Sequence, residues 1–237
     1  PSVGQWPTTW SSWPSHSRLL ATRCRAARAN PWPYAQMDLE RTIRSRRMVR
    51  SFSSEPVDAS EVDRLCDLAR RAPSAGNTQA VEFLVLDTPE SVSAYWEETL
   101  TSDARARFGW PGLLVSPVLI VVCVRPDAYV ERYSEADKSR TGLGGGQDRW
   151  TVPYWWVDAG AVAQNLLLAA VSAGLGACLF GLFEHETAVA RHFGVPDDRR
   201  LVATIAVGHP DPAGSAPGRS AGRARPPLSK VVHRSGW

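Results

Sequence analysis

The sequence predicts a fold in which a β-sheet is covered by α-helices on both faces. Segments with helical periodicity alternate with short apolar runs rich in β-branched residues, which are typical of strands. Two or three of these runs are apolar at nearly every position, and such strands need protein on both faces of the sheet. The chain has 237 residues, 43% of them hydrophobic and 22% charged, which is enough to bury one good core. We therefore predict a single domain.

The predicted elements begin after residue 36. Met37 opens the segment MDLERTIRSRR, in which Asp38 and Glu40 suit the positive end of a helix and the arginines lie toward its other end. Residues 57–72 have apolar side chains along one helix face, with Asp58 and Ser60 as possible caps. The other predicted elements are strands over residues 82–87, 117–124 and 202–207, a helix over 157–173 followed by a strand that ends near residue 181, and a short strand over 228–233.

Residues 1–36 differ from the rest of the chain in composition. They contain four tryptophans, four arginines and several prolines and serines, but no aspartate or glutamate. An organellar transit peptide can have such a composition, but the prolines and scattered tryptophans would break an amphipathic helix. We expect an extension outside the fold, either disordered or not native to the protein, with Met37 as the natural first residue. Removing its four arginines lowers the formal net charge from +3 to about −1.

Several classes of function find no support in the sequence. The cysteines stand far apart, with no CxxC pair and no cluster with histidine at zinc spacing, so we expect buried, reduced thiols and no metal site. Reduced thiols indicate a reducing compartment, and we predict a cytoplasmic protein. The longest apolar run, residues 159–173, is too short and too interrupted to span a membrane. The small net charge argues against binding to nucleic acid.

Near the start of the fold, four arginines occur within seven residues: Arg44, Arg46, Arg47 and Arg50. Such a run is more often a solvated basic face than a phosphate site. Arginine nevertheless suits phosphate, because its planar fork donates two hydrogen bonds to two oxygens. On this motif alone both interpretations stay open.

The segment APSAGNTQ, residues 72–79, joins a predicted helix to a predicted strand. Pro73 stops the helix and Gly76 permits a tight turn. Ser74, Asn77 and Gln79 then place donors and acceptors on a loop between rigid elements, where ligand-binding groups often lie. This pattern favours a binding loop over an ordinary polar turn.

The segment GLGACLFG, residues 174–181, superficially matches the glycine fingerprint of dinucleotide-binding folds. That fingerprint follows a strand and opens a helix, whereas this segment follows a helix and opens a strand, so we reject a Rossmann fold. Gly181 at the end of the strand would leave a backbone N–H free to approach a flat ligand. The run GLGGG, residues 142–146, lacks the lysine and hydroxyl residues of a phosphate loop and predicts a flexible loop.

Two segments suggest a second copy of the chain. The helix over residues 157–173 is apolar almost all round, so it is either the central helix of a monomer or a helix that a partner covers on one side. In a chain of this size, a dimer interface is a reasonable inference. The tail, about residues 213–237, is rich in glycine, proline, arginine and serine, and we expect an arm that reaches another part of the molecule or the partner.

Together and in this order, these segments resemble the nitroreductase family over nearly all of residues 37–237. The matching pieces are RRMVRSF, APSAGNTQ, NLLLAAVSAGLGACLFG, GVPDD followed by VATIAVGHP, and RARPPLSKVVH. Each piece is weak alone, but five in sequence at fitting intervals make a strong match. The resemblance implies an α+β sandwich with a mixed, mainly antiparallel sheet flanked by helices, assembled as an intertwined homodimer with two FMN sites at the interface.

The resemblance also implies which residues contact the cofactor. Arg46 and Arg47 would bind the phosphate and ribityl end, Arg225 would grip the phosphate, and Arg50 would lie near the pyrimidine edge, where a cation stabilises negative charge on the flavin. The full set that it implies is Arg46, Arg47, Met48, Arg50, Pro73, Ser74, Ala75, Asn77, Gln79, Phe180, Gly181 and Arg225.

Within this set, some contacts would come from the partner subunit. Pro73 and Ser74 are expected to reach the flavin across the interface, while the backbone of Gly181 would donate to the reactive nitrogen of the ring. Met48 stands where many family members have serine, so one hydroxyl contact to the cofactor is absent.

The implied activity is that of a flavin enzyme. The sequence presents no catalytic triad, carboxylate pair or metal cluster, which fits an enzyme whose flavin carries the chemistry. It would take hydride from NADH or NADPH and reduce nitroaromatics, quinones or similar electron-poor small molecules in a ping-pong cycle. Relatives of the fold also carry out dehalogenation, dehydrogenation or deazaflavin-linked reduction, and a flavin-binding protein without turnover is a further alternative.

Aromatic residues in the segment 150–156 could shape the substrate pocket. Trp150, Tyr154 and Trp155 would form a wall that stacks acceptors, with residues 142–146 as a mobile lid. Packing in the core or at a dimer interface explains these aromatics equally well, since aromatic side chains supply large buried area anywhere.

Overall fold

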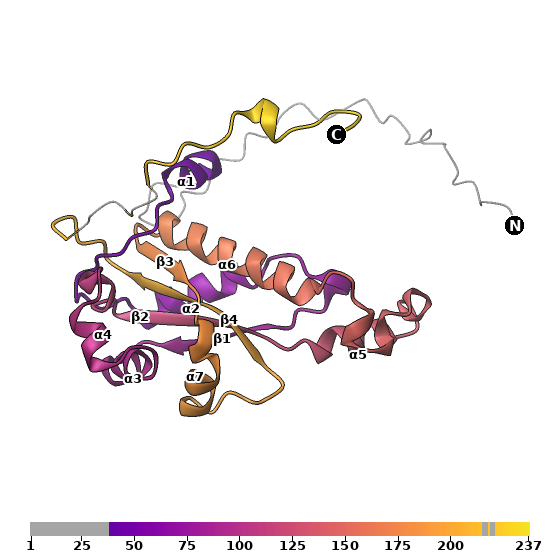
Figure 1. Cartoon of the computed structure of the whole chain (residues 1–237), viewed down its shortest axis with the longest axis horizontal. Helices are drawn as coiled ribbons and strands as arrows, with labels where there is room; N and C mark the ends of the chain where they lie inside the picture. The colour runs from indigo at the N-terminus through magenta and orange to yellow at the C-terminus, as the bar shows by residue number, and fades with distance from the viewer. Residues whose placement is uncertain (1–37, 215–217, 219–220) are drawn as a thin grey trace, which may run out of the picture. The chain divides into compact units, whose positions relative to one another are not determined.

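The structure is a computed structural model, and it describes residues 38–214, 218 and 221–237 (Figure 1). All of these residues belong to one compact unit that spans residues 36–237. The extension predicted over residues 1–36, and Met37 after it, lie outside the described residues.

Most helices and strands occur where the sequence predicts them. The helices are α1 (Leu39–Ser45), α2 (Ala59–Ala69), α3 (Pro89–Thr99), α4 (Ser102–Ala106), α5 (Asp127–Ser134), α6 (Tyr154–Ser172) and α7 (Glu186–His192). The strands are β1 (Val81–Leu86), β2 (Val118–Val124), β3 (Gly176–Phe180) and β4 (Arg200–Gly208). Helices α3, α4, α5 and α7 are additional helices that the sequence did not predict.

The four strands form one sheet in the order β1-β2-β4-β3, and all neighbouring strands are antiparallel. In the register, Val121 of β2 faces Leu84 on one side and Thr204 on the other, and Thr204 also faces Phe180 of β3. The parallel contact in the described residues is an isolated bridge between Met48 and Ala177. The predicted α+β fold with a mainly antiparallel sheet is confirmed.

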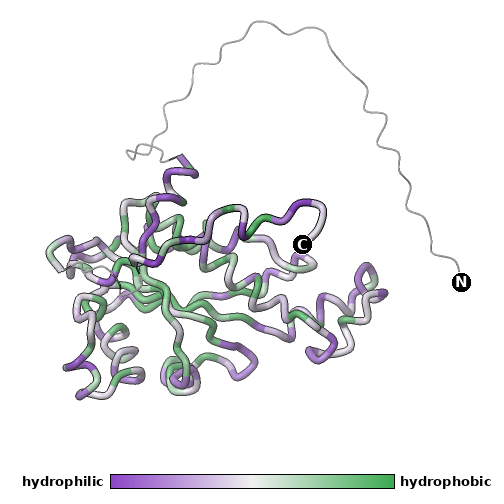
Figure 2. The backbone as a smooth tube through the Cα atoms, turned by 45° about the horizontal axis from the view of Figure 1, so that its top comes forward, coloured by the Kyte–Doolittle hydropathy of each residue, from purple (hydrophilic) through white to green (hydrophobic). Residues whose placement is uncertain are grey.

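The sheet lies between two layers of helices, as the apolar strands predict (Figure 1). Every residue of β2 is buried, because Ile120 and its same-face neighbours pack toward α2 and α6 while Leu119 and Val121 pack toward α3 and α7. Figure 2 shows the hydrophobic colouring concentrated along the central strands. Burial on both faces removes a large apolar area from water, and this term dominates the stability of such a core.

Local sequence signals determine where the helices begin. Asp58 caps α2, where its carboxylate accepts a hydrogen bond from the Ser60 N–H at 2.9 Å, as predicted. Thr88 and Ser91 cap α3 reciprocally. Helix α6 starts at Tyr154, directly after Pro153 and three residues before the predicted start.

The strand predicted over residues 228–233 is wrong. Leu228–Lys230 is a 3₁₀ turn, in which the N–H groups of Lys230 and Val231 donate to the carbonyls of Pro227 and Leu228. Every residue from 221 to 237 is exposed in the single chain. No neighbouring strand offers hydrogen bonds to this part of the described tail, so short-range turns satisfy the backbone instead.

Candidate functional site

The arginine segment lies beside β3, next to the segment GLGACLFG. Val49 donates its N–H to the carbonyl of Ala177 at 3.0 Å, adjacent to the bridge formed by Met48. The Leu179 N–H lies 3.5 Å from the sulfur of Met48. A Cβ on Gly176 would lie 2.9 Å from the Val49 side chain, so glycine permits this close approach. Two of the predicted site segments therefore meet within one chain.

Arg46 has the electrostatic features of an anion site. It caps α1, with its backbone N–H donating to the Thr42 carbonyl at 3.1 Å. Its Nη1 atom is buried and has no hydrogen-bond partner among the described residues. A buried cationic donor without an acceptor is costly, so this atom is suited to an oxygen of a bound anion.

Arg47 and Arg50 extend the positive charge along the same segment. Arg47 is exposed, and its Nη1 donates to the carbonyls of Arg44 at 2.7 Å and Arg46 at 3.0 Å. The guanidinium of Arg50 lies 5.4 Å from the ring centre of Trp110. Stacking of this kind orients a cation without neutralising it, so the charge of Arg50 remains available to a ligand.

The loop over residues 73–79 is fastened to α5 and α6. The Ala75 N–H and the Tyr129 hydroxyl both donate to the Asp158 carboxylate at 2.8 Å, and the Arg132 Nε donates to the Gly76 carbonyl at 2.8 Å. Burial raises the pKa of Tyr129, and its bond to Asp158 raises that pKa further. Sequence reasoning missed Asp158 and Tyr129; an acidic residue inside an otherwise apolar helix was the signal that could have found the first.

Within this loop, polar side chains bond to one another, and the backbone enters the left-handed region. The Gln79 N–H donates to the Ser74 hydroxyl at 3.0 Å, and the Gln79 side-chain amide donates to Asn77 at 2.9 Å. Gly76, Asn77 and Gln79 have positive φ values of 62°, 57° and 54°. A Cβ on Gly76 would lie 2.7 Å from the Tyr133 ring, so glycine is needed there. Glycine and asparagine adopt positive φ values readily, so the strain falls on Gln79, and strain held in place by the surrounding structure is typical of binding loops.

In one chain, the loop and the arginine segment lie at opposite ends of α6 (Figure 1). The loop bonds to Asp158 near the start of the helix, whereas Met48 bridges to β3 just beyond its end at Ser172. Ser172 follows Asp158 by fourteen positions along the helix, which corresponds to about 21 Å at about 1.5 Å per residue. The structure therefore does not bring these two groups of predicted site residues together within one chain.

The remaining predicted cofactor residues lie at the end of β3 and in the tail. Phe180 turns its ring toward α3, where it stacks on Trp96 with ring centres 5.7 Å apart. Gly181 follows directly and is partly exposed. Arg225 is exposed, and it forms no ion pair within the described part of the chain.

Comparison with known proteins decides the family. The sequence profile of the Nitroreductase family matches residues 43–209, which include every predicted cofactor residue except Arg225. The chain belongs to the nitroreductase family. Membership makes the protein an oxidoreductase.

Relatives and solved structures cover most of the chain. A chloronitrobenzene nitroreductase from Comamonas testosteroni is 29% identical over 196 residues, covering 71% of this chain and 85% of that protein. A 5,6-dimethylbenzimidazole synthase from Rhodobacter capsulatus is 26% identical over 215 residues, covering 84% of this chain and 90% of that protein. A nitroreductase family protein from Streptococcus pneumoniae TIGR4 shares the fold with a TM-score of 0.63 at 20% identity, covering 83% of this chain and 100% of that chain.

The three aromatic residues predicted to shape the substrate pocket differ in exposure. Trp150 and Trp155 are only 6% and 5% exposed and pack with Tyr129 in a small aromatic core. Tyr154 is 45% exposed in the single chain. Core packing therefore explains Trp150 and Trp155. Trp156, which the sequence analysis did not select, is 37% exposed in the same segment.

The glycine run over residues 142–146 is tied to its surroundings. The Ser134 hydroxyl donates to the Gly144 carbonyl at 3.2 Å, and the Trp150 indole N–H donates to the Leu143 carbonyl at 3.1 Å. These bonds hold the run against α5 and the aromatic core, whereas composition alone predicted a flexible loop and a mobile lid.

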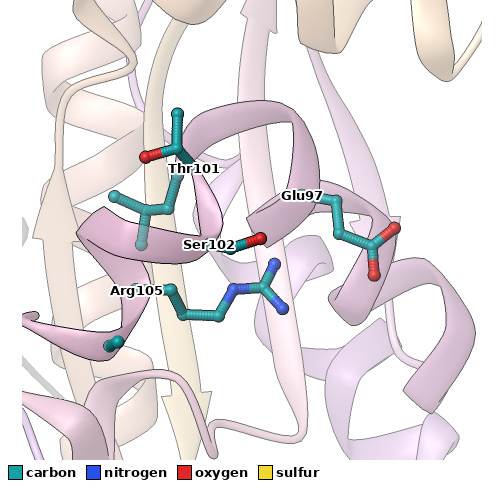
Figure 3. A pocket seen from close by; sticks show the side chains of 6 residues that line it. Glu97, Thr101, Ser102 and Arg105 are labelled. Carbon is teal, nitrogen blue, oxygen red and sulfur yellow. The ribbon is translucent and has the colours of Figure 1, made fainter.

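A separate surface hollow lies where α3 ends and α4 begins. Figure 3 shows the labelled side chains that line it, and the full set is Glu97, Leu100, Thr101, Ser102, Arg105 and Ala106. None of these residues belongs to the predicted site. The hollow is open and formed by one short stretch of chain, so we do not assign the family's chemistry to it.

Two further findings bear on function. Within residues 38–214, 218 and 221–237, no group of three or more histidine, cysteine or acidic side chains is placed to hold a metal ion. In the same described residues, no helix has the length and apolar character needed to cross a membrane.

Proposed function

We propose that the protein is an FMN-dependent homodimer that takes hydride from NADH or NADPH and reduces electron-poor small molecules such as nitroaromatics and quinones. The observation that carries this proposal is Arg46, whose buried Nη1 lacks a partner among the described residues. It lies in the segment that borders β3, next to the strand that leads to Gly181. A phosphate oxygen would satisfy this donor.

The residues beside β3 fit FMN. Arg46 and Arg47 would bind the phosphate, and exposed Arg225 would join them from the tail. Arg50 would face the pyrimidine edge, with Trp110 orienting its guanidinium. Since the ring of Phe180 packs toward α3, we expect the contact from this part of β3 to come from the backbone of Gly181.

A second copy of the chain would supply the other half of the site. The polar loop carrying Ser74, Asn77 and Gln79 lies too far along α6 to reach the arginine segment of its own chain. Helix α6 also leaves Val157 51% exposed in a helix that is otherwise largely apolar. A homodimer would cover this surface and place the loop of one protomer at the arginines of its partner.

When bound, FMN would supply two-electron transfer, so that a nitro compound reacts as R–NO₂ + NAD(P)H + H⁺ → R–NO + NAD(P)⁺ + H₂O. The side chains of this chain would bind and orient. Arg50 would stabilise negative charge at the pyrimidine edge, and the Gly181 N–H would donate at the reactive edge of the ring. The rigid loop at Ser74 would hold the ring in place.

A direct test is the colour of the purified protein. We expect a yellow protein that either NADH or NADPH bleaches. A colourless protein that takes up no added FMN would refute the proposal, and a yellow protein that neither nucleotide bleaches would show flavin binding without this activity.

The phosphate assignment has its own test. Arg46→Ala and Arg225→Ala should each lower the FMN content after purification, measured as the ratio of flavin to protein absorbance. Arg44→Ala is the matched control, because Arg44 pairs with Glu40 and is 77% exposed. Full retention of FMN by both test variants would overturn the assignment.

A second candidate keeps the flavin site but changes the reaction. The relative that synthesises 5,6-dimethylbenzimidazole covers 84% of this chain, more than the chloronitrobenzene nitroreductase does. Dehalogenation, dehydrogenation and deazaflavin-linked reduction belong to the same alternative. Steady-state turnover of an acceptor panel with each nicotinamide separates the candidates, since failure on every nitroaromatic and quinone would favour a different redox reaction.

We also propose that the enzyme works in the cytoplasm. Cys66, Cys123 and Cys178, the cysteines within the described residues, are free thiols, which agrees with a reducing compartment.

A further inference from the structure

An exposed aromatic residue follows directly after the proposed flavin contact. Phe183 lies two residues beyond Gly181, and its side chain is 82% exposed. Leu182 between them is only 3% exposed and packs in the core on the face of the sheet that α3 and α7 cover. One apolar side chain thus points inward and the next one points outward.

The backbone of Phe183 is strained. Its φ is +51°, in the left-handed region that bulky side chains rarely adopt. Burial does not compensate for this strain, because the ring is exposed in the single chain. Glycine or asparagine would suit the backbone better, so the fold alone does not explain phenylalanine at this position.

The turn that carries Phe183 is fixed at both ends. The His185 N–H donates to the carbonyl of buried Leu182 at 3.0 Å. Immediately afterwards, the Glu186 carboxylate accepts hydrogen bonds from Arg200 at 2.7 and 3.0 Å and from the Leu201 N–H at 3.0 Å. The exposed ring therefore projects from a supported position and not from a free loop.

The ring of Phe183 lies against Gly181. A Cβ placed on Gly181 would be 3.3 Å from the Cζ atom at the tip of the ring. The ring therefore covers the side of Gly181 where any other residue would project a side chain. This places a flat apolar surface next to the backbone that we assign to the reactive edge of the flavin.

We propose that Phe183 stacks on flat, electron-poor aromatic acceptors bound over the flavin and thereby favours them over compact, non-aromatic acceptors. The proposal rests on the proposed function, because Gly181 borders the substrate only if FMN binds beside it. An aromatic ring suits this task, since it offers a large contact surface with few rotatable bonds.

Binding of an unreactive flat probe tests the proposal without turnover. Benzoate is titrated into the FMN-loaded protein without nicotinamide, and the dissociation constant is read from the shift of the visible flavin band. We expect Phe183→Ala and Phe183→Leu to raise this constant about fivefold to tenfold, the scale of one aromatic pair. Phe183→Tyr keeps the ring and should stay within about twofold of the unaltered protein.

Two further measurements exclude other roles for the ring. Reduction of ferricyanide, a compact acceptor, should proceed equally in all four proteins. Phe183→Gly should melt at the same temperature as the unaltered protein or higher, because glycine adopts this φ without strain. A lower melting temperature, or loss of the dimer in Phe183→Ala, would show that the ring stabilises the fold or the interface and would overturn the proposal.

Failure of this inference differs from failure of the proposed function. If the unaltered protein takes up no FMN or is not reduced by a nicotinamide, the proposed function fails. If it binds FMN and is reduced, yet Phe183→Ala binds benzoate as tightly as the unaltered protein, only the role of Phe183 is refuted.

Discussion

The bond between the polar loop and α6 can be tested by replacing Asp158 with alanine. Asp158 is only 5% exposed, and its carboxylate accepts hydrogen bonds from the Ala75 N–H and the Tyr129 hydroxyl, both at 2.8 Å. Asp158→Ala removes the acceptor from both donors at once. We expect a less stable protein whose loop over residues 73–79 is no longer anchored at Ala75.

The magnitude follows from the two bonds. A hydrogen bond to a charged group contributes about 1.5–3 kcal/mol, so two of them give roughly 3–6 kcal/mol. Removing the buried charge returns part of its desolvation cost, which leaves a net loss of about 3 kcal/mol in the free energy of unfolding. Tyr129→Phe removes one bond and keeps the other, so it should cost about 1.5 kcal/mol.

Urea unfolding followed by tryptophan fluorescence measures these losses. Protein and FMN concentrations are kept the same for all variants, because ligand binding and dimerisation shift the apparent stability. Hydrogen exchange at the Ala75 N–H should also speed up in Asp158→Ala while staying slow in Tyr129→Phe.

A double variant completes the test. Because Asp158 and Tyr129 share one bond, the combined variant should lose less stability than the sum of the two single losses. A loss below about 1 kcal/mol for Asp158→Ala, or strict additivity in the double variant, would refute the anchoring role.

The remaining predictions concern titratable groups. The hydrogen bond from Arg200 holds the pKa of Glu186 below its ordinary value of 4.5, so the stability from this carboxylate is complete above that pH and is lost as pH falls through the lowered pKa. Glu186→Gln should therefore melt below the unaltered protein at pH 7, and this difference should shrink as the pH falls below 4.5; a difference that stays the same at acidic pH would contradict this. Burial raises the pKa of Cys66 and of Cys123 to about 11, so iodoacetamide at about pH 8 should label neither thiol in the folded protein and both in urea. Peptide mass spectrometry measures the labelling, and equal rates in both states would contradict the burial.

Elements whose structure follows from nearby residues were predictable. The strand over residues 117–124 is apolar at every position but its first, and β2 is buried along its whole length. The cap at Asp58 and the turn at Gly76 follow from local chemistry in the same way. The strand predicted over residues 228–233 failed because a strand needs a neighbour, and apolar β-branched residues do not reveal whether one is present.

The residue types of the site could also be predicted from the sequence, whereas their arrangement in space could not. The arginine run and the amide-rich loop were identified from residue types, but their positions at opposite ends of α6 were not. The exposure of the aromatic residues could not be predicted from the sequence either, since Trp155 is buried and Tyr154, its neighbour in the chain, is exposed. Side chains that follow one another on a helix point in different directions, and only the packing around the helix decides which of them reach solvent.

Residue order alone thus determined the apolar strands, the helix faces, the polar loop and the family to which the chain belongs, because each of these depends on patterns within a short stretch or on motifs in sequence. Tertiary structure decided that Arg46 has a buried donor without a partner in the described residues, and that Asp158 anchors Ala75 across 83 residues of chain. Burial and hydrogen-bond pairing depend on which distant segments come together, and that depends on how the whole chain packs its core.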